Sequence, residues 1–219
     1  MSKPIIAVTR KLPPSIETRM MELFGTRLNE DDQPLSAAEI VAKCDGADVL
    51  VPTVTDGINA ALIAALPDNI RLIANFGVGV DHIDLKAAAA RDILVTNTPG
   101  VLTEATADLT FALLLSVTRR LPEGAAAVQE GRWGPWNPSW LLGSELHGST
   151  LGIVGPGRIG TAVALRAQGF GMKVVYHGRR EAPDFPGHRT EWGDLLAIAD
   201  IVSAHVPLDA ETERMFDAA

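Results

Sequence analysis

The stretch TLGIVGPGRIG, residues 150–160, is the strongest indication of the fold of the second half of the chain. Its first five residues, Thr150–Val154, are mostly apolar and β-branched, which favours a buried strand. Three glycines follow with the spacing GxGxxG, at Gly155, Gly157 and Gly160. The apolar residues behind them recur at helical spacing, at Ile159, Val163, Ala167 and Phe170. A strand that runs through a glycine turn into an amphipathic helix predicts the start of a parallel βαβ unit.

The residues after this turn continue the alternation of strand and helix. Strands are predicted at Lys173–Tyr176 and Ile201–Ala204. The helix predicted between them has one apolar face, formed by Trp192, Leu195, Leu196 and Ala199. A GxGxxG motif alone is a weak signal, but inside a βαβαβ unit it is a specific sign of a dinucleotide site.

Each glycine of the motif has a separate task in such a site. Gly155 makes the tight turn, Gly157 lets the backbone approach a pyrophosphate, and Gly160 lets helix and strand pack closely. The N-terminus of the helix then offers free N–H groups and a positive dipole end to the phosphates. The alternative is a glycine-rich turn that binds nothing.

The end of the second strand predicts which dinucleotide is bound. An NAD enzyme usually places Asp or Glu there, about 20 residues into the motif, to hold the ribose hydroxyls. This chain has His177, Gly178, Arg179 and Arg180 instead. Two guanidinium groups without an acid before them suit the 2′-phosphate of NADP(H), so NADP(H) is the predicted cofactor and NAD(H) the alternative. The pair could also be a solvated surface pair, since Glu181 lies next to it and could contact a ribose.

The first hundred residues also alternate short apolar runs with amphipathic stretches. The predicted strands are Ile5–Val8, Asp48–Val51, Leu72–Asn75 and Ile93–Thr96. Helices are predicted from Pro13 or Pro14 to Phe24, from the capping box at Ser36 to about Cys44, from Asn59 to Leu66, and from Asp84 to Arg91. This alternation predicts an α/β domain with a parallel sheet, which ends at the breaker cluster Thr98–Gly100.

A second glycine-rich turn, NFGVGVDH at residues 75–82, follows a strand of this first domain. Its third motif position is His82 instead of glycine, so a second dinucleotide site is not expected. Its backbone N–H groups could bind a small anion such as a carboxylate. The alternative is a plain tight turn.

The segment that joins the two halves is predicted to be a long helix followed by an irregular arm. The helix, Thr103 to about Leu121, is apolar around most of its circumference, which predicts burial against its own domain or a partner. The arm, Glu123 to Gly148, is rich in Gly and Pro and carries Trp133, Trp136 and Trp140. Exposed aromatic arms usually mark an interface; the alternative is a loop folded over its own core.

Composition excludes several classes of protein. The 219 residues carry 19 Lys+Arg against 27 Asp+Glu, a net charge of −8, and the pI is near 5.1, which argues against nucleic-acid binding. No apolar run approaches the ~18 residues of a membrane-spanning helix. The single cysteine, Cys44, cannot form an internal disulfide, which fits a reducing compartment. We therefore expect a cytoplasmic globular protein, without nucleic-acid, membrane or metal partners.

Five segments together resemble the D-isomer-specific 2-hydroxyacid dehydrogenase family, and within it the glyoxylate/hydroxypyruvate reductases. They are NFGVGVDHID at 75–84, TNTPGVLTEATADLTFALLL at 96–115, WNPSWLLG at 136–143, LGIVGPGRIG at 151–160 and SAHVPLDAETERMF at 203–216. The resemblance covers essentially the whole chain and is far more specific than the glycine motif alone.

The resemblance implies a flavodoxin-like substrate domain at residues 1–100 and a Rossmann-type doubly wound dinucleotide-binding domain at 101–219, of which only the first half is present. The dimerisation helix and arm would span residues 103–147. It implies that the Val78-Gly79 turn binds the substrate carboxylate, and that Trp140 reaches the neighbouring subunit's cleft in a homodimer. The implied cofactor contacts are Thr106, Arg158, Ile159, His205, Val206, Pro207 and Thr212, in addition to the three glycines and Arg179 and Arg180.

The family chemistry would be hydride transfer between NADP(H) and a small 2-oxo or 2-hydroxy acid such as glyoxylate or hydroxypyruvate. The resemblance places the histidine that donates the proton, its acidic partner and the arginine that polarises the carbonyl after residue 216. We therefore assign no catalytic residue within the chain, and predict that the 219 residues alone are inactive and leave a sheet edge uncovered. His82 and His205 match structural or cofactor-lining positions, and we expect Asp81 and His82 to bond the backbone of their own turn.

Two other functions stay open on the sequence. One is a non-catalytic dinucleotide-binding regulator on the same fold. The other is a different member of the family, such as a phosphoglycerate-, phosphite- or formate-type dehydrogenase, against which Trp140 and the pair Arg179-Arg180 argue.

Overall fold

The computed structural model describes residues 3–217, which divide into two compact units. Unit 1 comprises the residues up to Val101 together with Pro207–Met215. Unit 2 comprises Leu102–Val206 together with the residues from Phe216 onward. The segment Pro207–Met215, which the sequence assigns to the second domain, therefore groups with unit 1.

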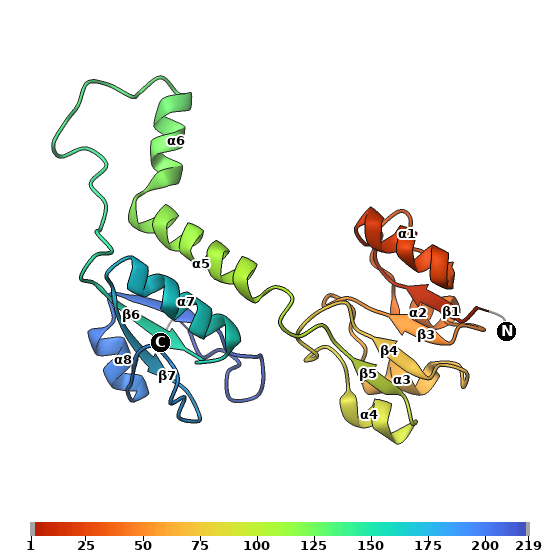
Figure 1. The fold of residues 1–219 in the computed structure, drawn as a ribbon. Coiled ribbons are helices and arrows are strands. Elements are labelled where there is room, and N and C mark those ends of the chain that lie inside the picture. The colour runs from red at the N-terminus through yellow and green to blue at the C-terminus, as the bar shows by residue number, and fades with distance from the viewer. Residues whose placement is uncertain (1–2, 218–219) are drawn as a thin grey trace. The chain divides into compact units, whose positions relative to one another are not determined.

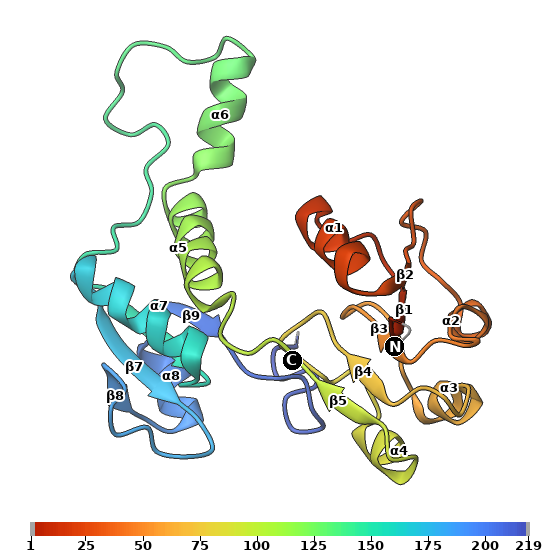
Figure 2. The same cartoon turned by 45° about the vertical axis from the view of Figure 1, so that its right-hand side comes forward.

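Unit 1 is built on a five-stranded parallel sheet with the order β2-β1-β3-β4-β5 (Figures 1 and 2). Its strands are β1 Ile5–Val8, β2 Gly25–Arg27, β3 Val49–Val51, β4 Leu72–Ala74 and β5 Leu94–Thr96. Its helices are α1 Pro14–Leu23, α2 Ala37–Lys43, α3 Ala60–Ala65 and α4 Leu85–Ala90. The order is that of flavodoxin-like sheets, so the predicted fold class of this unit is confirmed.

Three of the predicted helix starts in unit 1 are confirmed by side-chain caps. Ser36 and Glu39 form a reciprocal capping box at α2, in which the Ser36 hydroxyl accepts from the Glu39 amide. The side chains of Asn59 and Asp84 accept from the third amide of α3 and of α4. Each cap satisfies one N–H group that the first helical turn leaves without a partner.

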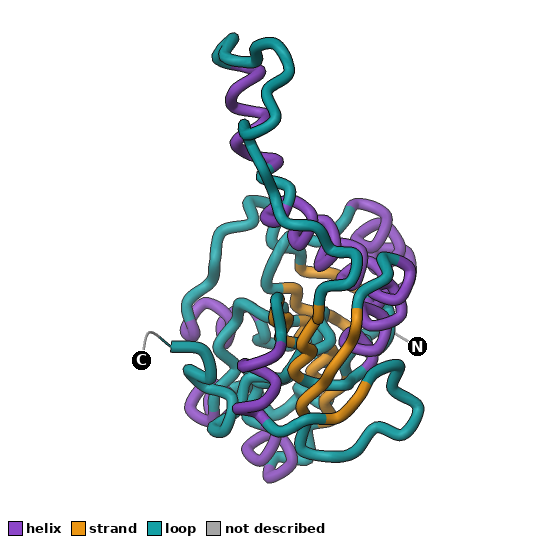
Figure 3. The backbone as a smooth tube through the Cα atoms, turned by 90° about the vertical axis from the view of Figure 1, so that its left-hand side faces the viewer, coloured by secondary structure: helices purple, strands orange, loops and turns teal. Residues whose placement is uncertain are grey.

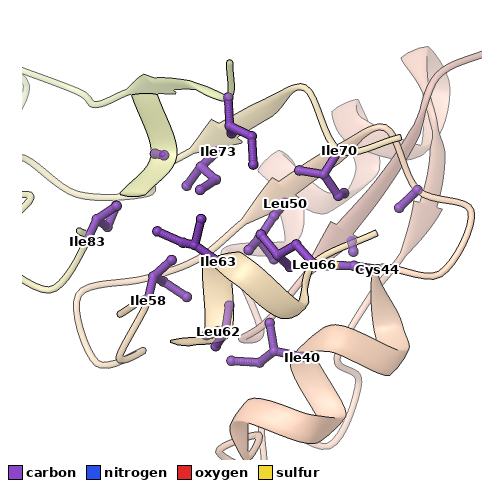
Figure 4. Close-up of a cluster of buried hydrophobic side chains, with 14 residues drawn as sticks. Ile40, Cys44, Leu50, Ile58, Leu62, Ile63, Leu66, Ile70, Ile73 and Ile83 are labelled. Atoms are coloured by element: carbon purple, nitrogen blue, oxygen red, sulfur yellow. The ribbon is translucent and has the colours of Figure 1, made fainter. Parts of the chain in front are cut away.

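The helices of unit 1 cover both faces of its sheet. One face packs against α2, α3 and α4 through a large aliphatic cluster (Figure 4) that includes Ile40, Leu50, Ile63 and Ile73. The other face packs against α1 through Ile6, Val8 and Val51, with Met20 and Phe24 beside them. Cys44 lies inside the first cluster, and burial raises the pKa of its thiol to about 11, so it is a protonated core residue at neutral pH.

Unit 2 holds a four-stranded parallel sheet with the order β8-β7-β6-β9. Its strands are β6 Thr150–Val154, β7 Lys173–His177, β8 His188–Arg189 and β9 Ile201–Ala204. Its helices are α5 Thr103–Thr118, α6 Leu121–Gln129, α7 Arg158–Gly169 and α8 Trp192–Ile198. Numbered from β6, this is the order 3-2-1-4 of a Rossmann-type fold, which confirms the predicted dinucleotide-binding architecture.

The structure differs from the sequence predictions in three places. It adds the strands β2 and β8, which are short, polar and on sheet edges, so they carry no apolar alternation. It also begins the predicted irregular arm with the helix α6, because Pro122 is tolerated in the first turn and a run of three alanines follows. From Glu130 to the start of β6 the arm is loop throughout (Figure 3).

The long helix α5 buries one face only. Ala107, Phe111 and Leu114 are buried against α7 and β6, where Phe111 stacks on Phe170 with ring centroids 4.9 Å apart. On its other side Leu109, Leu113 and Val117 form a row that is 58, 59 and 76% exposed. The sequence predicts that this side is buried as well, but in unit 2 it is exposed. Among residues 3–217, no helix has the length and apolar character needed to cross a bilayer.

Candidate functional site

The glycine turn between β6 and α7 is as tight as the GxGxxG spacing predicts. Gly155 has a φ of +95°, and a Cβ there would lie 2.6 Å from the carbonyl oxygen of His205. A Cβ on Gly160 would overlap the carbonyl oxygen of Gly155. Gly157 differs, because a Cβ there would meet no atom within 4 Å. The first and third glycines are therefore required by the protein's own packing, whereas the second leaves open space in front of the turn.

The N-terminus of α7 faces this open space with unused hydrogen-bond donors. Gly157 is the N-cap, has extended backbone angles and offers no side chain to cap the helix. The first hydrogen bond of the helix runs from the Thr161 amide to the Gly157 carbonyl at 2.8 Å. Within residues 3–217 the amides of Arg158 and Ile159 donate to no acceptor. Free N–H groups at the positive end of a 12-residue helix fit a pyrophosphate.

The predicted arginine pair follows β7 next to the glycine turn. Gly178 packs against Pro156, since a Cβ on Gly178 would lie 2.5 Å from the proline Cδ. This contact brings the segment that carries Arg179 and Arg180 beside the residues expected to hold the phosphates. Both arginines are exposed, and no carboxylate stands at the end of β7.

Sequence reasoning missed a third arginine beside this pair. Arg189 lies on β8 opposite Tyr176 of β7. Its guanidinium is 3.7 Å from the Glu181 carboxylate and 3.5 Å from the Gly178 carbonyl oxygen. The side chains of Arg189 and Glu181 are 37 and 77% exposed. Only the pairing of β8 with β7 places this charge, and a two-residue polar strand gives no signal in the sequence.

The end of β9 forms the opposite wall of the glycine turn. The His205 amide donates to the Val154 carbonyl at 2.7 Å, which places the His205 carbonyl against Gly155. The His205 Nε2 lies 2.9 Å from the Ser203 hydroxyl, and burial lowers the pKa of the ring. Thr106 of α5 and residues 201–205 line one hollow of about 470 Å³. Thr106 and His205 are therefore brought together within unit 2.

The predicted contacts Pro207 and Thr212 lie in the segment that groups with unit 1. The Thr212 hydroxyl donates to the Pro207 carbonyl at 2.6 Å and accepts from the Asp209 amide at 2.9 Å. These bonds fold the segment into a compact turn. Pro207 and Leu208 line a hollow of about 630 Å³ together with Val78 and Gly79.

The Val78-Gly79 turn has its carbonyl groups occupied and its amides open. The Val78 carbonyl accepts from the Asn97 side chain at 2.7 Å, and the Gly79 carbonyl accepts from the Asn75 side chain at 2.8 Å. Within the described chain the amides of Val78 and Gly79 donate to no acceptor. Gly77 allows the turn to approach the loop that follows β3, since a Cβ there would lie 2.6 Å from a methyl group of Val54. Open amides on such a turn can bind a carboxylate.

The His82 ring contacts a side chain instead of the turn's own backbone, so the prediction for His82 is wrong. Its Nε2 lies 3.0 Å from the Asn75 Oδ1, and it is Asn75 and Asn97 that hold the turn's carbonyls. Asn75 is therefore a second residue that sequence reasoning missed. Its place at the end of an apolar run hides its polar role.

Trp140 lies in the arm of unit 2, where it packs edge-on against Trp133 with ring centroids 5.1 Å apart. Both rings border a hollow of about 530 Å³ lined by α6 and the arm. Trp136 beside them is 87% exposed. Among residues 3–217 no group of three or more His, Cys, Asp or Glu side chains is placed to hold a metal ion.

Comparison with known proteins identifies a matching family and similar structures. A family profile for the D-isomer specific 2-hydroxyacid dehydrogenase NAD binding domain matches residues 111–219. A crystal structure of a putative D-isomer specific 2-hydroxyacid dehydrogenase from Polaromonas is 35% identical, covers 96% of this chain and 67% of its own, and superposes with a TM-score of 0.88. The chain belongs to the D-isomer specific 2-hydroxyacid dehydrogenase family. The members of this family are oxidoreductases that act on 2-hydroxy acids.

Two further relatives of the chain carry the names of reductases. The glyoxylate reductase of Korarchaeum cryptofilum is 44% identical over 221 residues, which cover 97% of this chain and 65% of that protein. An NADPH-dependent glyoxylate/hydroxypyruvate reductase from Sinorhizobium meliloti, solved with NADP and malonate, is 34% identical with a TM-score of 0.82 and covers 96% of this chain and 65% of its own. This chain thus spans about two thirds of the length of these relatives.

Proposed function

We propose that the protein containing this chain is an NADP(H)-dependent 2-hydroxyacid dehydrogenase that reduces a small 2-oxo acid, glyoxylate or hydroxypyruvate. The observation that carries the proposal is the Val78-Gly79 turn, whose carbonyls are held from within and whose amides are open. A 2-oxo acid carries one carboxylate, and two neighbouring N–H groups suit its two oxygens. The glyoxylate reductase of Korarchaeum cryptofilum supports this substrate class.

The residues of the glycine turn fit a dinucleotide. Gly157 leaves open space, and the amides of Arg158 and Ile159 are free to bind the pyrophosphate, with Gly155 and Gly160 shaping the turn. When bound, NADPH supplies the hydride that reduces the carbonyl carbon of the 2-oxo acid. Thr106, His205, Pro207 and Thr212 complete the proposed set of cofactor contacts.

We propose that Arg179 and Arg180 bind the 2′-phosphate of NADPH and thereby cause a preference for NADPH over NADH. Guanidinium groups bind phosphate through charge-assisted, often bidentate hydrogen bonds. The Sinorhizobium meliloti reductase, solved with NADP, supports this choice. Glu181 lies 3.7 Å from the Arg189 guanidinium in this structure, an ion pair in place of the ribose contact that would favour NADH.

The proposed assembly is a homodimer in which the arm carries Trp140 to the neighbouring subunit. The exposed row Leu109, Leu113 and Val117 on α5 and the exposed Trp136 in the arm support a partner surface on unit 2. The proposed cytoplasmic location stays a prediction.

Turnover by the intact protein tests the proposed function. The measurement is the loss of NADPH absorbance with glyoxylate, hydroxypyruvate, pyruvate and 3-phosphohydroxypyruvate side by side. Highest kcat/KM with glyoxylate or hydroxypyruvate supports the proposal, and highest kcat/KM with the phosphorylated substrate makes it a phosphoglycerate-type enzyme. Dinucleotide binding without any turnover would replace the proposal with a non-catalytic regulator.

A further inference from the structure

Asn75 is the buried anchor of the turn that follows β4. The residue is 2% exposed, and its Nδ2 donates to the carbonyls of Gly77 at 3.2 Å and Gly79 at 2.8 Å. Its Oδ1 lies 3.0 Å from the Nε2 of His82. Since an amide oxygen only accepts, the His82 Nε2 carries the proton and donates it to this bond.

His82 supports the orientation of the Asn75 amide. The two glycine carbonyls need a donor, so they keep Nδ2 on their side, and the His82 Nε2–H donates to the Oδ1 on the other side. The His82 Nδ1 is buried and has no partner within residues 3–217, so the bond to Asn75 is the one polar contact of the ring there. Loss of His82 therefore removes the donor to Oδ1 of the buried Asn75.

These and neighbouring hydrogen bonds occupy the carbonyl groups of the turn. The Gly77 carbonyl accepts from the Thr98 amide at 3.0 Å as well as from Asn75, and the Val78 carbonyl accepts from Asn97. Every carbonyl from Gly77 to Gly79 is thus held, by Asn75 or by the segment Asn97–Thr98. The amides of Val78 and Gly79 have no acceptor within residues 3–217, and both residues line the hollow of about 630 Å³.

We propose that Asn75 is a positioning residue for the substrate carboxylate, in an orientation that His82 supports. The inference rests on the proposed function of the Val78-Gly79 turn. Asn75 holds the carbonyls of the Gly77–Val78 and Gly79–Val80 peptide groups, and Asn97 holds the carbonyl of the peptide group between them. Asn75 thereby keeps the Val78 N–H, and not the Gly77 carbonyl oxygen, toward the carboxylate. If a peptide group rotates, a partial negative charge meets the carboxylate and binding weakens.

The test compares Asn75→Ala with a matched control, Asn29→Ala, in the intact protein. Asn29 also lies in unit 1, is 8% exposed, and donates from Nδ2 to two carbonyls, of Thr9 at 2.7 Å and Gln33 at 2.8 Å. Each variant loses two hydrogen bonds from Nδ2 to backbone carbonyls, and Asn75→Ala also loses the bond from His82, but only Asn75 holds the turn. We expect Asn75→Ala to raise the KM for glyoxylate about tenfold with kcat changed less than about threefold, because uniform binding is lost. The Kd for NADPH stays unchanged, and Asn29→Ala leaves the KM unchanged.

An equal rise of KM in Asn29→Ala, or an unchanged KM in Asn75→Ala, overturns the inference. If Asn75→Ala does not fold, His82→Leu removes the orienting donor at a less buried position, and His82→Gln restores one. We then expect a raised KM in His82→Leu and a KM near that of the wild type in His82→Gln, and the reverse order overturns the inference.

Binding of oxalate, an unreactive dicarboxylate, gives a readout that needs no turnover. Calorimetry should show oxalate binding to the wild type and binding about tenfold weaker to Asn75→Ala. A wild type that neither turns over glyoxylate nor binds oxalate defeats the proposed function, and the inference with it. A wild type that does both, beside an Asn75→Ala variant that equals it, defeats the inference alone.

Discussion

The guanidinium of Arg189 lies 3.7 Å from the carboxylate of Glu181, directly beside the turn that carries Arg179 and Arg180. The charge that Arg189 adds to the proposed phosphate site is therefore partly offset by an acid. A 2′-phosphate entering this site would compete with Glu181 for the same guanidinium. Cofactor preference should depend on both members of this pair, and not only on the arginines that the sequence reveals.

Substitutions around this pair should change the ratio of kcat/KM for NADPH to that for NADH. Arg180→Gln should lower the ratio about tenfold or more, because a charge-assisted bond to the phosphate is lost. Arg189→Gln should lower it by a smaller factor, and Glu181→Gln should raise it. Arg19→Gln, which removes an exposed arginine of α1 in unit 1, serves as the control. A ratio unaffected by Arg180→Gln would exclude this arginine from phosphate binding.

Gly157 and Gly160 should respond differently to alanine. Gly160→Ala should lower the melting temperature and abolish dinucleotide binding, because its Cβ overlaps the Gly155 carbonyl. Gly157→Ala should keep the melting temperature but weaken NADPH binding about tenfold or more, because its Cβ fills the space of the pyrophosphate. The matched control is Gly193→Ala, in open space on α8. Unchanged NADPH affinity in Gly157→Ala would contradict the assigned site.

Acidification should destabilise unit 2 partly through His205. Burial lowers the pKa of this ring below its ordinary 6.5, so the unfolded chain takes up the proton at a higher pH than the folded one. Stability is therefore full above about pH 6.5 and falls as the pH drops toward the lowered pKa of the folded state. Thermal melts between about pH 5 and 8, the range in which histidine titrates, should show a smaller loss of stability on acidification in His205→Gln than in the wild type. The exposed His188→Gln serves as the control, and equal slopes in all three proteins would count against the argument.

Asp56 should be a strong structural residue of unit 1. Its carboxylate is 6% exposed and accepts from the Thr9 hydroxyl at 2.6 Å and the Thr53 amide at 2.7 Å, which ties the ends of β1 and β3 together. Asp56→Ala leaves the Thr53 amide without a partner and the Thr9 hydroxyl with only the Val51 carbonyl at 3.3 Å, and we expect a loss of about 1–3 kcal/mol in the free energy of unfolding. Hydrogen exchange of β1 and β3 should accelerate, whereas that of β6 and β7 in unit 2 stays the same. Uniform acceleration in both units would show that the effect is not local.

The sequence predicts those parts of the fold that strong local patterns specify. The strand and helix around Gly155, Gly157 and Gly160 follow from apolar periodicity and glycine spacing, and the starts of α2, α3 and α4 follow from capping residues. The strands β2 and β8 are not predicted, because short polar edge strands form through pairing with a neighbouring strand. No local sequence pattern encodes that pairing.

The missed site residues have the same kind of cause. Arg189 joins the arginine pair only through the pairing of β8 with β7. The sequence predicts Asn75 as the last residue of a strand. Its role depends on the turn, which folds back so that Nδ2 reaches the Gly77 and Gly79 carbonyls. In both residues the function depends on tertiary contacts that residue type and spacing do not reveal.

The most direct test of the central claim is the kcat/KM of the intact protein for glyoxylate reduction, measured with NADPH and with NADH. The account predicts turnover with NADPH, at a kcat/KM about tenfold or more above that with NADH. Preference for NADH, or no oxidation of either dinucleotide by any 2-oxo acid, would contradict it.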